Sequence, residues 1–133
     1  IELNDVLQRA ARIAGSNALV LVFSDFDGLN GHSESLIRKL AASNDLILFS
    51  VTDPLARSLP ADMRAAISDG ALQADFDASD PALRTKVEQA FRNRTSDLEH
   101  WSRRYGFPLV PLGTEVPALD QLMQHFGLRG GAR

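Results

Sequence analysis

The chain has 133 residues, 44% of them hydrophobic, a formal net charge of -3 and no cysteine. This composition predicts one globular domain over residues 1–133 and excludes a disulfide framework, a thiolate nucleophile and a cysteine-ligated zinc site. The basic residues are scattered, no apolar run is long enough to span a bilayer, and no signal peptide is visible. We therefore expect no nucleic-acid surface, no direct membrane contact from this segment and a cytoplasmic location.

The first half of the chain has the pattern of a strand, a helix and a second strand, preceded by a helix. Apolar residues at helical spacing predict a helix over residues 3–14, ended by Gly15. The continuous apolar run Ala18–Phe23 is typical of a central parallel strand that is covered on both faces. A helix over residues 36–41 and a buried strand over residues 46–52 follow. This order predicts a right-handed parallel crossover.

The second half begins with a hairpin signal, Asp69-Gly70 between two short strand-like runs. The predicted buried side of this hairpin consists of Ile67, Leu72 and Phe76.

A long helix is then predicted from the Asp80-Pro81 cap to Gly106, with Trp101 and Tyr105 on its core-facing side. The stretch 107–112 predicts a third parallel strand, and its two prolines favour a position near the sheet edge. Thr114 is predicted to cap a last helix that ends at Gly127.

The whole pattern predicts an α/β fold, a partial Rossmann-like sheet of three parallel strands with an inserted β-hairpin and flanking helices. Ligands of such sheets bind beyond the carboxyl ends of the strands. Asp25 and Asp27 follow the first strand there. The other polar residues expected at this edge are Ser50, Thr52, Asp53, Thr114 and Glu115.

One hypothesis for Asp25 and Asp27 is phosphoryl transfer. The stretch "VFSDFDGL" resembles the DxDG signature of the haloacid dehalogenase superfamily. That resemblance implies Asp25 as the nucleophile, Asp27 as the acid that protonates the leaving group, and Mg²⁺ on the phosphate. The chain departs from the pattern because Leu29 follows the glycine, and because a late acidic pair and a lysine after a strand are missing.

The order of elements along nearly the whole chain, with "LVLVFSDFDG", "VTDP", the Asp-Gly hairpin and "YGFPLVPLGTE", supports a second hypothesis. It resembles the C-terminal half of proteins in domain-of-unknown-function family 58, whose fold is similar to a von Willebrand factor type A domain. Such domains hold a divalent ion at a metal-ion-dependent adhesion site. Only Asp25 is carried over as a ligand, with Asp27 a weaker candidate. An Asp-x-Ser-x-Ser loop is missing, so the adhesion site is incomplete.

The second resemblance implies that the first half of the domain precedes Ile1 and that Mg²⁺ belongs to the full-length protein, with no cofactor in this segment. It implies a protein partner, in that family a MoxR-type AAA ATPase. The strand over residues 18–23 would pair with the missing half, so in this chain its apolar edge is exposed and we expect self-association through it.

The leading hypothesis is therefore a non-enzymatic protein-binding module of von Willebrand factor A type. The alternative is a Mg²⁺-dependent phosphatase that uses Asp25 and Asp27. A third hypothesis is a structural domain without metal, in which both aspartates only cap backbone amides of their loop.

Overall fold

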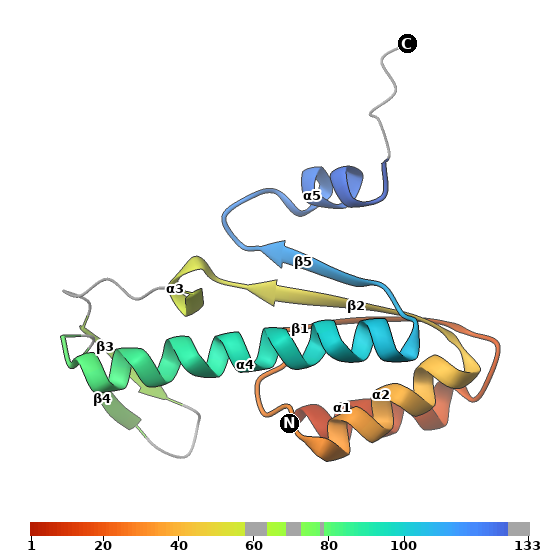
Figure 1. Cartoon of the computed structure of the whole chain (residues 1–133), viewed down its shortest axis with the longest axis horizontal. Coiled ribbons are helices and arrows are strands. Elements are labelled where there is room, and N and C mark those ends of the chain that lie inside the picture. Colours follow the sequence, from red (N-terminus) through yellow and green to blue (C-terminus); the bar gives the residue numbers. More distant parts are fainter. Residues whose placement is uncertain (58–63, 69–72, 78, 128–133) are drawn as a thin grey trace, which may run out of the picture.

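The computed structural model describes residues 1–57, 64–68, 73–77 and 79–127 (Figure 1). Helices and strands alternate along most of the chain, which confirms the predicted α/β class. The elements are α1 (Leu3–Ala14), β1 (Leu19–Ser24), α2 (Gly31–Ser43), β2 (Asp45–Thr52), α3 (Pro54–Arg57), β3 (Arg64–Ser68), β4 (Gln73–Asp77), α4 (Pro81–Tyr105), β5 (Leu109–Gly113) and α5 (Ala118–His125). Within the described residues, no helix has both the length and the apolar character needed to cross a membrane.

The main sheet has three parallel strands in the order β1-β2-β5, as the sequence predicts. Its central strand is β2, which pairs with β1 on one side and with β5 on the other. The predicted hairpin is the separate antiparallel pair of β3 and β4. The Asp69-Gly70 turn and the burial of Ile67, Leu72 and Phe76 lie outside what the structure describes.

Helices cover the two faces of the main sheet unequally. Figure 1 shows α1, α2 and α4 on one side of the sheet and the short α5 on the other. The larger core lies on the three-helix side and contains Leu7, Phe26, Leu36, Ile37, Leu40, Leu46, Leu48, Leu98, Trp101 and Phe107. A smaller cluster of Phe49, Val110 and Leu112 packs against Leu122 of α5. Most of the buried apolar side chains therefore lie on one face of the sheet.

The position of β1 differs from the prediction that both of its faces are covered. Alternate side chains are exposed on the α5 side: Leu19 by 65%, Leu21 by 47% and Phe23 by 56%. The Phe23 ring stacks on Phe49 of β2 at 4.2 Å, but α5 packs on β2 and β5 and leaves β1 open. Since β1 is also an edge strand, its sequence has the apolar character of a central strand in a partly exposed place.

The opposite edge of the sheet, β5, is protected. The Leu48 amide donates to the Pro108 carbonyl at 3.1 Å, so alternate residues from Pro108 onward bond to β2. Pro111 therefore has its missing N–H on the outer side, in agreement with the predicted edge position. Beyond it, the Gln121 side chain bonds to both the N–H and the C=O of Gly113 at 2.8 Å.

The start of the last helix was predicted wrongly. Thr114 does not cap it, because its amide donates to the Thr52 carbonyl at 3.1 Å and extends the pairing of β5 with β2. Helix α5 begins at Ala118, after Pro117, and no side chain caps it. The chain then turns at residues 114–115 and reaches the helix only at Ala118.

Helix α4 begins and ends where the sequence predicts. The Asp80 side chain accepts a hydrogen bond from the Ala82 amide, and Gly106 adopts the left-handed conformation with φ 73°. Near its end, the Tyr105 hydroxyl donates to Glu34 of α2 at 2.7 Å. This hydrogen bond joins two helices that cover the same face of the sheet.

Tyr105 gives the fold a predicted dependence on alkaline pH. The hydrogen bond to Glu34 and partial desolvation raise the pKa of Tyr105 above its ordinary value of 10.0, because a phenolate cannot donate to a carboxylate. The contribution to stability is complete below the pKa of the unfolded chain and is lost as the pH rises through the higher folded pKa. We expect Tyr105→Phe to reduce the fall in the free energy of unfolding at alkaline pH, as measured by urea denaturation.

Tyr105 is the single tyrosine of the chain, so an absorbance titration reports its pKa directly. The matched control is Glu34→Gln, which keeps an oxygen acceptor but removes the charge and should lower the titration midpoint. A midpoint at or below the ordinary value in the unmodified chain would contradict the interaction.

Candidate functional site

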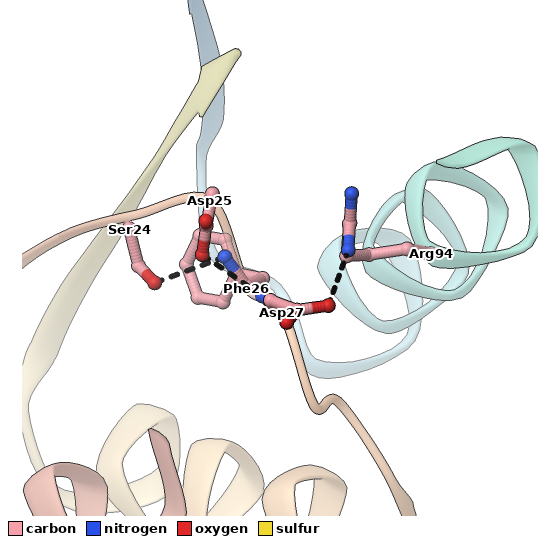
Figure 2. Close-up of polar contacts among 5 residues, drawn as sticks. All are labelled: Ser24, Asp25, Phe26, Asp27 and Arg94. Carbon is pink, nitrogen blue, oxygen red and sulfur yellow. Dashed lines mark hydrogen bonds and ion pairs between the residues drawn. The ribbon is translucent and has the colours of Figure 1, made fainter. Parts of the chain in front are cut away.

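The loop that follows β1 is held by its own side chains. The Ser24 hydroxyl accepts a hydrogen bond from the Phe26 amide at 2.9 Å, and the Asp25 carboxylate accepts one from the Asp27 amide at 3.0 Å (Figure 2). Serine and aspartate often stabilise turns by such bonds to the backbone two residues on. One Asp25 oxygen therefore has a structural role, as the third hypothesis proposes.

Phe26 anchors this loop in an unusual backbone conformation. Its φ is 56°, in the left-handed region, and its side chain is fully buried. The left-handed conformation costs a residue with a Cβ about 1–2 kcal/mol. Full burial of a phenylalanine ring contributes roughly 1.5–3 kcal/mol, which is enough to offset that cost. Gly28 follows with φ 77°, so the chain turns sharply on either side of Asp27.

Asp27 points away from the backbone and toward α4. Its carboxylate lies 3.1 Å from the guanidinium of Arg94, as Figure 2 shows. The Asp27 side chain is 84% exposed and that of Arg94 is 21% exposed, so solvent screens the pair and limits its contribution to about 1 kcal/mol or less. This contact could not be predicted from the sequence, because the two residues are 67 positions apart and no local pattern links them.

Asp25 and Asp27 line a groove of about 760 Å³ between the start of α1 and the end of β1. Val6, Val22 and Phe23 supply apolar side chains to it, and Glu2 adds a third carboxylate. The groove therefore combines an apolar wall with acidic residues, and it opens beside the exposed side chains of β1.

The other polar residues predicted at this edge do not line this groove. Ser50 and Thr52 line a smaller cavity of about 220 Å³ next to α4, together with Arg57 and Glu99. The two cavities have no lining residue in common, although the register of β1 and β2 pairs Ser24, next to Asp25, with Ser50.

The three further residues predicted at this edge do not line the groove of Asp25 and Asp27 either. Asp53 accepts the Leu55 amide at 2.9 Å and so begins α3. Glu115 and Thr114 are exposed after β5. Neither these residues nor the hydroxyls of β2 complete a site around Asp25.

The side chains that the structure describes do not form a cluster of metal ligands. Within those residues, no group of three or more histidine, cysteine, aspartate or glutamate side chains could hold a metal ion. Ca²⁺ takes six to eight oxygen ligands, whereas Mg²⁺ takes six, of which one or two are usually protein carboxylates and several are waters. Asp25, the ligand carried over from the type A resemblance, has no neighbouring set of this kind, and one of its oxygens is engaged by the Asp27 amide.

The loop geometry predicts different effects for two substitutions of Asp25. Asp25→Ala removes the acceptor for the Asp27 amide and should lower the free energy of unfolding by about 0.5–1.5 kcal/mol. Asp25→Asn keeps a side-chain oxygen and should change it by less than about 0.5 kcal/mol. Urea denaturation of the two variants measures the difference, and equal destabilisation would show that charge, and not the turn hydrogen bond, is what matters.

Comparison of this chain with family models, with curated proteins and with solved structures found no match in any of the three.

Proposed function

We propose that this chain is a non-enzymatic protein-binding module whose partner docks along β1. The observation that carries the proposal is the exposure of three large apolar side chains, Leu19, Leu21 and Phe23, on one face of an edge strand. Edge strands bind other chains through their free backbone groups, and the alternate side chains supply specificity. Contiguous exposed apolar surface of this kind is typical of protein interaction sites.

Helix α1 extends the apolar surface beside β1. Val6 is exposed and lines the groove with Phe23, and Ile13 is exposed seven residues later, nearly two helical turns along the same side. The strand edge, the groove and this side of α1 are neighbours, so a single partner can cover all three.

The arrangement of the polar residues favours binding over catalysis. In the haloacid dehalogenase resemblance, Ser50 or Thr52 at the end of β2 would stand for that family's hydroxyl motif, but both line a cavity that does not include Asp25. The phosphatase hypothesis also requires Asp27 as a proton donor, whereas Asp27 is ion-paired with Arg94.

The type A resemblance supports the same proposal from the order of the elements. It names a MoxR-type AAA ATPase as one candidate partner and a cytoplasmic location. The adhesion-site ion is not part of the proposal, because the described residues do not supply its ligands.

The phosphatase alternative is tested with Mg²⁺ and a generic aryl phosphate. We expect the chain to release no more phenol than its Asp25→Asn variant, which keeps the loop hydrogen bond. Turnover by the chain that this substitution abolishes would identify Asp25 as a nucleophile and would overturn the proposal.

The docking surface is tested by site-specific photo-crosslinking. We expect a benzoylphenylalanine placed at position 21 to form a defined adduct with another protein chain in the producing cells. The same residue at position 119 should form none, since Leu119 is equally aliphatic and 67% exposed but lies on α5. Mass spectrometry identifies the partner chain, and equal adducts from both positions would contradict docking along β1.

A further inference from the structure

We infer that the partner that docks along β1 is a second copy of this chain, joined by antiparallel pairing of the two β1 strands about a two-fold axis. This inference rests on the proposed function, because it names the occupant of the same surface. Four features support it: the direction of the free backbone groups, the faces of the side chains, the protected opposite edge and the charges of α1.

The free backbone groups of β1 belong to the residues with exposed side chains. The Asp45 amide donates to the Ala18 carbonyl at 2.9 Å, so Ala18 bonds to β2. Because alternate residues of a parallel strand bond to the same neighbour, Val20 and Val22 also direct their N–H and C=O groups to β2. Leu19, Leu21 and Phe23 therefore direct theirs to the open edge.

The alternation of side chains excludes registers shifted by one residue, and the register centred on Leu21 is the one that pairs all three exposed residues. Residues that lie opposite each other in an antiparallel pair point to the same face. A two-fold axis at Leu21 places Leu21 opposite its own copy and Leu19 opposite Phe23, so all the exposed apolar side chains share one face. In this register Leu21 forms two backbone hydrogen bonds with its own copy, and Leu19 forms two with Phe23 of the other chain. Two three-stranded sheets become one sheet of six strands.

The opposite edge favours a closed dimer over an open chain of molecules. Head-to-tail assembly would pair β1 of one copy with β5 of the next. Pro111 removes one outward N–H from β5, and the Gln121 side chain occupies both backbone groups of Gly113. No proline or charged residue protects β1 in the same way. Pairing of β1 with itself is the arrangement that remains.

The charges of α1 fit a second copy in the antiparallel orientation. Glu2 and Asp5 lie at the beginning of α1, and Arg9 and Arg12 lie toward its end; all four are exposed. The start of α1 lies beside the end of β1. The two-fold axis therefore also places the two α1 helices next to each other in antiparallel orientation. The acidic half of each helix then faces the basic half of the other, and the exposed Val6 faces Ile13. Opposite charges across an interface favour this orientation over the parallel one.

Sedimentation of the purified chain over a dilution series tests the inference. We expect a monomer–dimer equilibrium, and Leu21→Lys should raise the dissociation constant at least about tenfold, because two lysines then meet at the centre of the paired edges. Leu119→Lys is the matched control and should leave the constant unchanged, since it adds the same charge on α5. Circular dichroism shows whether each variant is folded.

A second measurement uses α1 and leaves β1 intact. The variants Arg9→Glu/Arg12→Glu and Glu2→Lys/Asp5→Lys should each dimerise more weakly alone, and mixing them should restore a heterodimer in native mass spectrometry.

A chain that stays monomeric at high concentration overturns the second copy as partner, and so do larger open assemblies. A dimer that tolerates Leu21→Lys overturns the β1 contact. If the chain is monomeric but position 21 still crosslinks to a different protein, the proposed function survives and this inference fails. If position 21 crosslinks to nothing, both fail.

Discussion

The packing of α1, α2 and α4 against one face of the parallel sheet determines where the other features of this protein lie. That face buries Leu46 and Leu48 of the central strand against Leu40 and Trp101. The other face has only α5, which covers β2 and β5. A parallel sheet is normally covered on both faces, because its strands are apolar on both. Here β1 is the strand that α5 does not cover. The exposed apolar side chains therefore lie on the same strand as the unpaired edge.

The same packing explains why the two aspartates do not form a catalytic pair. The Phe26 ring inserts into the three-helix core and holds the loop between them in a left-handed turn. Asp25 is turned back onto the loop backbone, and Asp27 is turned outward to Arg94 (Figure 2). A nucleophile and a proton donor must face the same reacting atom. Because Phe26 lies between the two aspartates and is held in the core, the two carboxylates point in different directions.

Much of this fold could be predicted from sequence because its signals are local. The apolar runs gave the strands, the Asp80 cap and Gly106 gave the ends of α4, and the prolines of β5 indicated an edge. The errors concern interactions between distant segments. The exposure of β1 depends on which other strands and helices pack against it. The contact of Arg94 with Asp27 depends on how α4 crosses the sheet.

The candidate site was predicted less completely than the fold for the same reason. Sequence position placed Asp25, Ser50 and Thr52 at the carboxyl ends of neighbouring strands, and the register of β1 and β2 agrees with that. Side chains at such an edge can still line different cavities on the same face of the sheet. Ser50 and Thr52 line the cavity next to α4, whereas Asp25 lines the groove next to α1, and only the folded chain contains that information.

The open face of β1 also connects binding to stability. A partner that binds only the folded chain adds RT ln(1 + [L]/Kd), about 2.7 kcal/mol when its free concentration is a hundred times Kd. That amount equals the full burial of roughly one large apolar side chain, such as Phe23. A domain whose sheet has three strands and one sparsely covered face gains much from such a term, since net stabilities are only about 5–15 kcal/mol. Under the proposed pairing, the apolar residues of β1 contribute their burial free energy when two chains meet. Strand β1 would then lie in the middle of a six-stranded sheet, which accounts for its apolar, central-strand sequence.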